Sequence, residues 1–211
     1  MRNLKRLSVI AILVIASVQT QSQVRFGPKV GMNFSTMKIK SWGIPIDPGY
    51  LVGFQGGILS EISLGNFALQ PAFLYSMKGS SYKNSSLEFY GKLIPEYLEI
   101  PINALYKIGA GPLKVMLMAG PYFSYGIRGK HTVTLAQETN EDAIKFGSSL
   151  GHDLKPLDIG INLGGGLEKF PLQLTVQYGM GFMNLDPCLD DGWEKKNKVV
   201  AISLVYLFGS K

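Results

Sequence analysis

The sequence has 211 residues, of which 46% are hydrophobic and 17% charged, and it contains 25 glycines. The length fits one domain, or at most two small ones, and the charged fraction is below the quarter that is usual in soluble domains. The net charge of +6 falls to about +3 without Arg2, Lys5 and Arg6. Because no run of Lys and Arg could follow a phosphate backbone, we expect no nucleic-acid partner.

Residues 1–22 are predicted to be a cleaved secretory signal peptide. A basic segment is followed by the apolar stretch Leu7–Val18, and Thr20 and Ser22 precede a cleavage site before Gln23. The apolar stretch is shorter than the roughly 20 residues that a membrane-spanning helix needs. The predicted organisation is therefore a signal peptide (1–22) followed by one mature domain (23–211).

The rest of the chain shows an alternation of apolar and polar residues with a period of two, which is typical of β-strands with one buried face. In one segment Leu172, Leu174, Val176 and Tyr178 alternate with Gln173, Thr175 and Gln177. Eight such segments occur, at about 26–34, 52–62, 67–78, 97–108, 115–125, 157–168, 172–182 and 200–208. Their length suits tilted membrane strands better than soluble strands.

The connections between these segments alternate in length. Short turns are expected near 64–66, 109–112 and 169–171, and long loops at about 35–49, 79–95, 127–156 and 184–197. Short turns on one side and long loops on the other are typical of outer-membrane barrels. The predicted fold is therefore all-β: a closed, antiparallel transmembrane β-barrel of about eight strands, an up-and-down meander like OmpA and OmpX, with both termini in the periplasm.

A soluble, lipocalin-like barrel is the alternative fold, with its apolar face inside. The polar positions here are mostly Gly, Ala, Ser, Asn and Gln, which fit the narrow interior of an eight-stranded barrel. Aromatic residues stand at the strand ends on the apolar side, as expected of the girdles at the two membrane interfaces; these are Phe26, Phe34, Tyr75, Tyr106, Tyr125, Phe182 and Phe208. Both observations favour the membrane barrel.

The polar face then lines the lumen and carries charges of both signs, which must pair because an unpaired buried charge is costly. The predicted lumen network consists of Lys29, Glu61, Lys78, Glu99, Asn103, Lys107, Asp158, Asn162, Glu168 and Gln177. We expect this network to fill the lumen, and a narrow ion pathway is the alternative role.

No catalytic, cofactor or metal site is predicted. Cys188 is a single cysteine and cannot form an internal disulfide. His131 and His152 lack metal-ligand spacing, and Ser149, His152 and Asp153 are too close in sequence for a typical triad. An acidic group in the last long loop, made of Asp186, Asp190, Asp191 and Glu194, could bind Ca²⁺. We expect instead that these are solvated loop residues. Gly164–Gly166 are expected as strand glycines, since no phosphate-loop motif follows.

Several motifs resemble the PorT-like outer-membrane β-barrel proteins of the Bacteroidetes. They are the opening strand from Phe26 to Ser35, Gly53-Phe54-Gln55-Gly56-Gly57, Leu69-Gln70-Pro71, Leu74–Gly79, Tyr97-Leu98-Glu99-Ile100-Pro101 followed by Gly120-Pro121-Tyr122, Asp158–Glu168, and the ending Leu204–Phe208. The chain departs from many such barrels in that Gly209-Ser210-Lys211 follow the last aromatic residue. The resemblance implies an outer-membrane barrel, and PorT itself is linked to a protein-secretion and gliding machinery.

The leading hypothesis is a non-enzymatic outer-membrane barrel that is structural, adhesive or associated with a secretion machinery. The alternatives are a small passive pore or transporter and a soluble periplasmic ligand-binding barrel. The expected partners are outer-membrane lipid and, through the long loops, envelope or secretion-machinery proteins. No cofactor is expected, and the barrel is predicted to be a monomer.

Overall fold

The computed structural model describes residues 23–41, 44–46, 48–84, 89–109, 111–135, 138–149, 151–187 and 193–209. The predicted signal peptide lies outside these residues. The strands are β1 (Gln23–Ser41), β2 (Ile44–Ile46), β3 (Leu51–Leu64), β4 (Phe67–Met77), β5 (Ser80–Asn84), β6 (Phe89–Ile108), β7 (Leu113–Leu135), β8 (Glu138–Ala143), β9 (Leu157–Lys169), β10 (Leu172–Gly181) and β11 (Trp193–Tyr206). The described part of the chain contains no helix long and apolar enough to cross a membrane.

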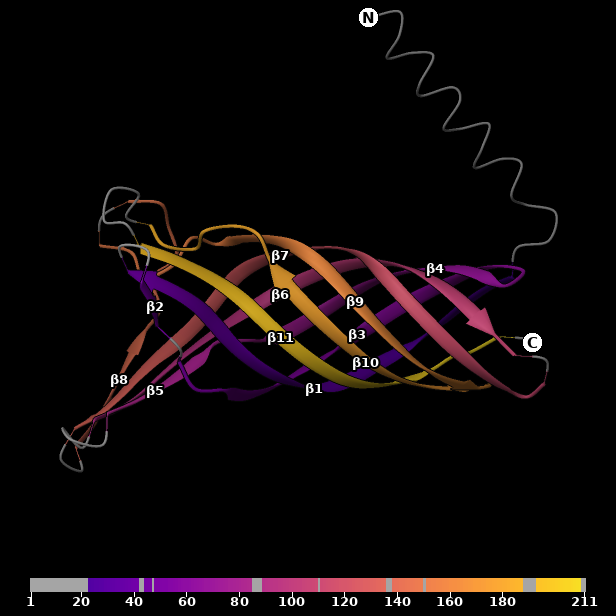
Figure 1. Cartoon of the computed structure of the whole chain (residues 1–211), viewed down its shortest axis with the longest axis horizontal. Helices are drawn as coiled ribbons and strands as arrows, with labels where there is room; N and C mark the ends of the chain where they lie inside the picture. Colours follow the sequence, from indigo (N-terminus) through magenta and orange to yellow (C-terminus); the bar gives the residue numbers. More distant parts are fainter. Residues whose placement is uncertain are drawn as a thin grey trace, which may run out of the picture.

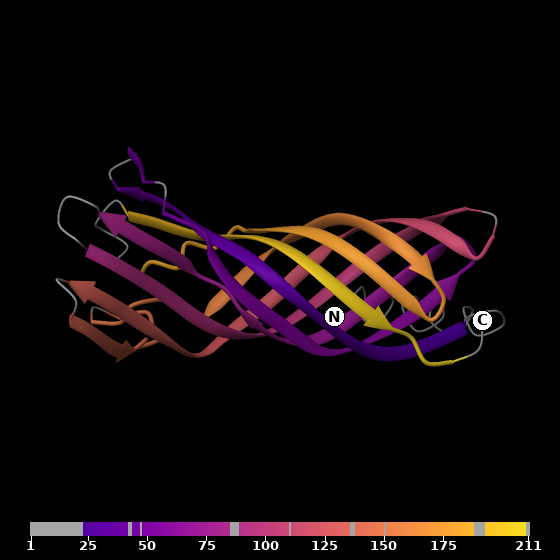
Figure 2. The same cartoon turned by 90° about the horizontal axis from the view of Figure 1, so that it is seen from below.

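Eight of these strands form a closed antiparallel ring (Figure 1, Figure 2). Going round the ring, the order is β1, β3, β4, β6, β7, β9, β10 and β11, and β11 pairs with β1. The closing pair runs from Lys29↔Val205 to Ser41↔Trp193. The predicted eight-stranded meander is confirmed, while β2, β5 and β8 are short strands added outside the ring.

Three short turns lie at the same end of the barrel as the described chain ends, Gln23 and Gly209. One of them joins β3 to β4 through Gly65 and Asn66, since Leu64 pairs directly with Phe67. Gly65 has a φ of 64°, a conformation that glycine adopts without steric cost. We call this end the turn side and assign it to the periplasm, because outer-membrane barrels have short periplasmic turns and longer extracellular loops.

The side chains are arranged with the apolar face outward. Along β10, Leu174 and Val176 are about half exposed, whereas Gln173, Thr175 and Gln177 are at most 5% exposed. The same arrangement, with apolar side chains outside and polar ones inside, runs round the ring. In the least regular predicted strand, at 115–125, Met116 and Met118 are apolar residues that lie on the interior face. A polar interior and an apolar exterior suit a barrel surrounded by lipid, and they rule out the lipocalin-like alternative.

Aromatic side chains mark the two edges of the apolar exterior. On the turn side, Phe67 stacks against Tyr106 with ring centroids 4.9 Å apart. At the other end, which we call the loop side, Phe54 packs against Tyr75 at 5.5 Å. The ten residues of β10, at about 3.3 Å each and tilted by about 45°, rise roughly 23 Å. This height matches the apolar band of about 25 Å in outer-membrane barrels.

On the loop side the structure corrects the sequence prediction. The connections are longer there, but much of the four predicted loops is strand: β1 continues to Ser41, β6 begins at Phe89, β7 ends at Leu135, and β2, β5 and β8 are added. β8 exposes all six of its residues, and β2 and β5 have only three and five residues. In the β1 extension the interior residues Met37 and Ile39 are apolar and Lys38 is exposed, so these segments do not show the alternation of the membrane strands. The strands were missed for this reason.

The extensions of β6 and β7 carry β5 and β8 on their outer edges, forming a four-stranded sheet that we call the arm (Figure 1). A register shift occurs between Glu96 and Tyr97, where Glu96 pairs with Arg128 but Tyr97 pairs with Gly126. Ile127 is therefore the extra residue of a β-bulge. Bulges bend a strand and increase its twist, and this one lies where the arm leaves the barrel.

The fold predicts a depth-dependent cost for charge on the outer face. Val176→Arg places a guanidinium near the middle of the apolar band and should destabilise the barrel by about 2–4 kcal/mol, whereas Leu172→Arg at the turn-side rim should cost about 0–1 kcal/mol. Urea titration of the barrel refolded into lipid vesicles, followed by heat-modifiable gel mobility, measures both. Equal costs at the two positions would contradict the placement of the membrane.

Candidate functional site

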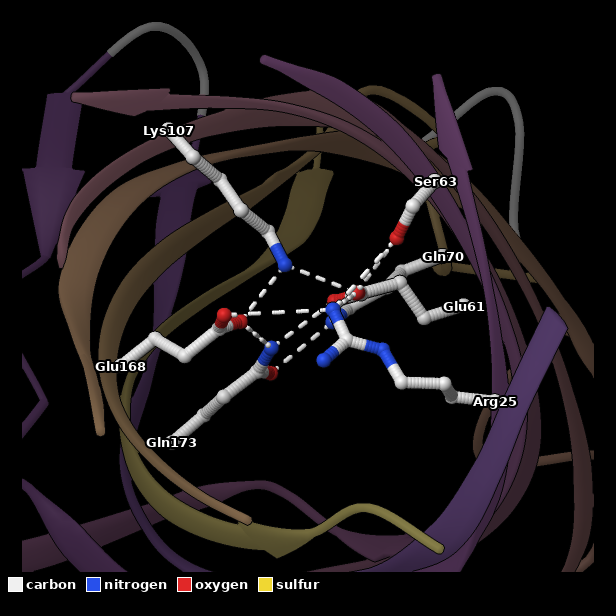
Figure 3. A network of polar contacts seen from close by, with 7 residues as sticks. All are labelled: Arg25, Glu61, Ser63, Gln70, Lys107, Glu168 and Gln173. Atoms are coloured by element: carbon white, nitrogen blue, oxygen red, sulfur yellow. Dashed lines mark hydrogen bonds and ion pairs between the residues drawn. The ribbon is translucent and has the colours of Figure 1, made fainter. Parts of the chain in front are cut away.

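The polar interior contains a cluster near the turn side, which we call the turn-side network (Figure 3). Six ring strands contribute to it: Arg25 from β1, Glu61 and Ser63 from β3, Gln70 from β4, Lys107 from β6, Glu168 from β9 and Gln173 from β10. Inward positions on neighbouring strands point to a common axis, so side chains from opposite walls meet across the narrow lumen.

Glu61 is the centre of this network and is fully buried. Its Oε1 is 2.7 Å from Lys107 Nζ and also accepts a hydrogen bond from Arg25. Its Oε2 accepts hydrogen bonds from Gln70 Nε2 at 2.7 Å and Gln173 Nε2 at 2.8 Å. Both carboxylate oxygens are therefore satisfied, as a charge removed from water requires.

Glu168 completes the balance of charge. Its Oε2 lies 2.5 Å from Lys107 Nζ and accepts a hydrogen bond from Gln173 at 2.7 Å, and its Oε1 lies 3.8 Å from an Arg25 nitrogen. Two cations thus face two carboxylates, and the network is neutral. A neutral, hydrogen-bonded cluster spanning the lumen makes a plug in the barrel.

A second cluster, the central network, lies nearer the loop side. Lys78 Nζ is 2.5 Å from Glu99 Oε2 and 3.7 Å from Asp158 Oδ2, and it lies 4.3 Å from the centre of the Tyr122 ring, within the range of a cation–π contact. Tyr122 donates a hydrogen bond to Asp158 at 3.1 Å. Ser124 donates to Glu99 at 2.9 Å, and Asn197 donates to Asp158 at 2.9 Å.

Lys29 is the second cation of this region, and its ammonium donates to Gln177 Oε1 at 2.7 Å. With Lys78, Glu99 and Asn162, these side chains help to line an internal cavity of about 20 Å³. This space holds about one water molecule. The central region therefore has room for single waters and not for a continuous aqueous channel.

Above the central network the interior changes from polar to apolar. Met37, Ile39, Ile144, Leu154 and Leu185 form a buried cluster, against which Tyr82, Leu93 and Phe146 pack. We call this cluster the cap. Its Phe146 ring meets Tyr97 edge-on at 6.2 Å, and burial raises the pKa of the Tyr82 phenol. The connection between β8 and β9 thus folds over the mouth of the barrel and packs on it.

All ten residues of the predicted lumen network are buried in the barrel interior. Glu61, Lys107 and Glu168 meet in the turn-side network, and Lys78, Glu99 and Asp158 meet in the central network. Lys29, Asn162 and Gln177 line the cavity between them. Asn103 pairs in register with Gln70, and its Oδ1 has no hydrogen-bond partner among the described residues.

The prediction missed several interior residues that make contacts. Arg25 continues the alternation one step before the first predicted strand, so extending that strand would have found it. Gln70 and Gln173 stood on the polar face but carry no charge. Tyr122 also stood on the polar face but was left out of the predicted network, and Asn197 fell in a predicted loop. Their roles depend on the register between strands, which a single sequence does not show.

The candidates for chemistry do not assemble. His152 Nδ1 lies 3.1 Å from the backbone oxygen of Ser149, and Asp153 accepts a backbone hydrogen bond from Lys145, so no triad forms. Within the described residues no group of three or more His, Cys, Asp or Glu side chains could hold a metal. Of the acidic group, Asp186 pairs with Lys195 at 2.9 Å and Glu194 with Lys196. Cys188, Asp190 and Asp191 lie outside the described residues.

Comparison with known proteins agrees with this architecture. The profile of the family "Outer membrane protein beta-barrel domain" matches residues 18–186. The chain belongs to this family. The match shows that the chain is an outer-membrane β-barrel protein, and the resemblance to PorT-like proteins of the Bacteroidetes stays a prediction. A comparison with curated proteins gives no match.

Among solved structures, this outer-membrane barrel is similar to the attachment invasion locus protein Ail of Yersinia pestis, at 14% identity and a TM-score of 0.42, covering 88% of this chain and 99% of Ail. The Neisserial surface protein A has 15% identity and a TM-score of 0.42, with 87% and 97% covered. A major outer membrane protein of Thermus thermophilus has 13% identity and a TM-score of 0.42, with 88% and 99% covered.

The turn-side network predicts a large effect of one isosteric substitution in this outer-membrane barrel. Glu61→Gln leaves Arg25 and Lys107 with one carboxylate between them and should cost about 3–5 kcal/mol of stability, because a buried charge loses its partner. The urea midpoint of the vesicle-embedded barrel measures this. Glu138→Gln, on the exposed strand β8, is the control and should change stability by less than about 0.5 kcal/mol. Similar effects for both would refute the network's role.

Proposed function

We propose that this protein is a non-enzymatic, closed outer-membrane barrel that presents a rigid extracellular sheet as a contact surface for other macromolecules. The observation that carries this proposal is the arm. It continues two membrane strands beyond the membrane, and its last strand, β8, has an open edge. The placement of the arm outside the cell follows from the assignment of the turn side to the periplasm.

The open edge of β8 is suited to pairing with an extended segment. β8 lies at one end of the strand order, and no other strand in the described ranges pairs with its outer edge. Ile144 N–H donates to Gly129 O at 3.0 Å, so by alternation Thr139, Glu141 and Ala143 direct their backbone groups away from β7. Exposed edges with unpaired N–H and C=O groups bind added strands.

The chemistry of β8 indicates the kind of segment that would pair there. All six of its residues are exposed, and Glu138, Glu141 and Asp142 are acidic. Glu141 is 2.6 Å from Lys130 on β7. Acidic side chains on an edge strand oppose pairing with a second copy of the same edge, because like charges opposite one another are destabilising. They favour an extended segment that carries Lys or Arg.

The proposal predicts that the protein does not conduct ions steadily. The turn-side network spans the lumen, the cavity in the central region holds about one water, and the cap covers the loop-side mouth. In planar bilayers the purified barrel should show no steady conductance, with a large porin in the same bilayers as the positive control. A steady ohmic conductance would instead support the passive pore or transporter.

The contact surface predicts a specific effect of proline. Thr139→Pro removes an outward N–H of β8 without removing a ladder bond to β7, and edge positions tolerate proline. Cells of a heterologous Gram-negative host that display the protein should attach to surfaces coated with extracellular proteins. The Thr139→Pro variant should lose most of this attachment, because an added strand loses one hydrogen bond and its register.

Thr139→Ala is the matched control, since it removes the same side chain and keeps the N–H. It should retain attachment close to that of the unmodified protein. Surface display of all three proteins is checked by heat-modifiable mobility and by antibody labelling of intact cells. Equal attachment by the proline and alanine variants would contradict strand pairing at this edge.

Association with a secretion machinery is the second candidate function, and the resemblance of the Tyr97–Pro101 and Gly120–Tyr122 motifs to PorT-like proteins supports it. Deleting the gene in its native host distinguishes the two. Loss of secreted proteins from the medium would favour the machinery role, whereas loss of attachment with normal secretion would favour the adhesive role.

A further inference from the structure

Three lysines gather on the outer face of the barrel at its loop side. Lys38 lies on β1 and is directly opposite Lys196 on β11, while Thr36 is opposite Lys198. Residues two apart on a strand share a face, so Lys38, Lys196 and Lys198 all project from the same outer face of two neighbouring strands. Like charges placed opposite and diagonal to one another repel, so an anion bound between them would relieve this repulsion.

The part of the chain that the structure describes supplies only part of that compensation. Glu194 pairs with Lys196, but neither Lys38 nor Lys198 forms an ion pair with any residue that the structure describes. Two other cations on the loop side are paired, Arg128 with Glu96 and Lys130 with Glu141. Lys38 and Lys198 therefore form a positive site without an ion-pair partner among the described residues.

A groove of about 430 Å³ lies at these two lysines. Its apolar lining includes Phe34, Tyr178 and Val200, and Thr36, Pro48 and Tyr50 also line it. Pockets that bind small molecules have volumes of roughly 300–1,000 Å³. The groove can therefore hold a headgroup of the size of a phosphorylated sugar.

The wall of the groove is fixed by hydrogen bonds. Thr36 Oγ1 donates to the backbone oxygen of Pro48 at 3.1 Å, and the backbone groups of Gly49 and Ser81 bond reciprocally at 2.7 and 3.1 Å. These bonds hold the segment before β3 against β1 and β5. A wall held in place before binding reduces the entropy that a ligand must overcome.

The height of the groove along the barrel identifies its surroundings. Phe34 and Tyr178 belong to the aromatic residues at the loop-side edge of the apolar band, where girdle side chains meet lipid headgroups. The apolar lining faces the acyl region, and Lys38 lies beyond it toward the outside. An amphiphile with an anionic headgroup would place its acyl chains along Val200 and its charge at the lysines.

We propose that this groove binds the phosphorylated headgroup of lipid A, the membrane anchor of lipopolysaccharide. Lipid A is the amphiphile that fills the outer leaflet, and it carries its phosphate on a sugar, which suits a groove with aromatic and hydroxyl walls. The site would hold the lipid at a fixed position on β1 and β11. This proposal concerns the outer wall of the barrel and does not depend on the contact function of the arm.

Native mass spectrometry of the full-length mature protein in detergent tests the proposal. The probes are purified lipid A, the same lipid A after removal of its phosphate, and phosphatidylglycerol. The variants are Lys38→Gln/Lys198→Gln and a matched control, Lys83→Gln/Lys169→Gln, which removes two exposed lysines from the arm and from the turn-side rim. Heat-modifiable mobility verifies that each variant is folded.

The wild-type protein should retain lipid A, and Lys38→Gln/Lys198→Gln should bind it about 25-fold more weakly, since each lysine near the interface contributes about fivefold. The control variant should bind within about twofold of the wild type, and dephosphorylated lipid A should not distinguish the variants. Equal binding of lipid A by the wild type and Lys38→Gln/Lys198→Gln would overturn the proposal. Phosphatidylglycerol binding of the same strength and lysine dependence would overturn the assignment to lipid A.

Discussion

The closed ring of backbone hydrogen bonds is the constraint on which the rest of this structure depends. A bilayer offers no water to an unpaired N–H or C=O group, so a spanning sheet must pair both edges of every strand. The antiparallel pairs of β1 with β11 and of β6 with β7 complete the circle. Closure determines which face meets lipid, and with eight strands it leaves a narrow interior.

That narrow interior explains why the polar face is a paired network and not a water-filled lumen. Gln and Ser fill much of the space, and most of the charges lie beside an opposite charge from another strand, whereas Lys29 bonds to the Gln177 amide. The turn-side network uses the amides of Gln70 and Gln173 to satisfy the carboxylate oxygens that the cations leave free. At the loop side the cap replaces polar contacts with apolar packing, so the two ends of the interior are closed by different physical means.

The sequence alone was sufficient to predict the strands inside the membrane, since lipid on one face and a packed lumen on the other impose alternation on every residue. Even Met116 and Met118, which interrupt the pattern, could be placed inward, because alternate residues of a strand share a face and these two alternate with the outward Val115 and Leu117. The alternation could not predict β8, whose six residues are all exposed, or β5, which has only five residues and packs Tyr82 on the cap. Nor could it pair Glu61 with Lys107, which are brought together by strand register and barrel stagger, or show that Lys38 stands opposite Lys196.

The bulge at Ile127 has a mechanical consequence. Because β6 and β7 run without a break from the membrane into the arm, the arm has no hinge, and the bend at the bulge sets its angle to the barrel axis. From Arg128 to Leu135, at about 3.3 Å per residue, the strand can reach roughly 26 Å beyond that bend. The arm therefore has a set length and a set direction relative to the barrel. When the barrel tilts in the membrane, the outer end of β8 moves farther than the bulge does, because it lies farther from the barrel.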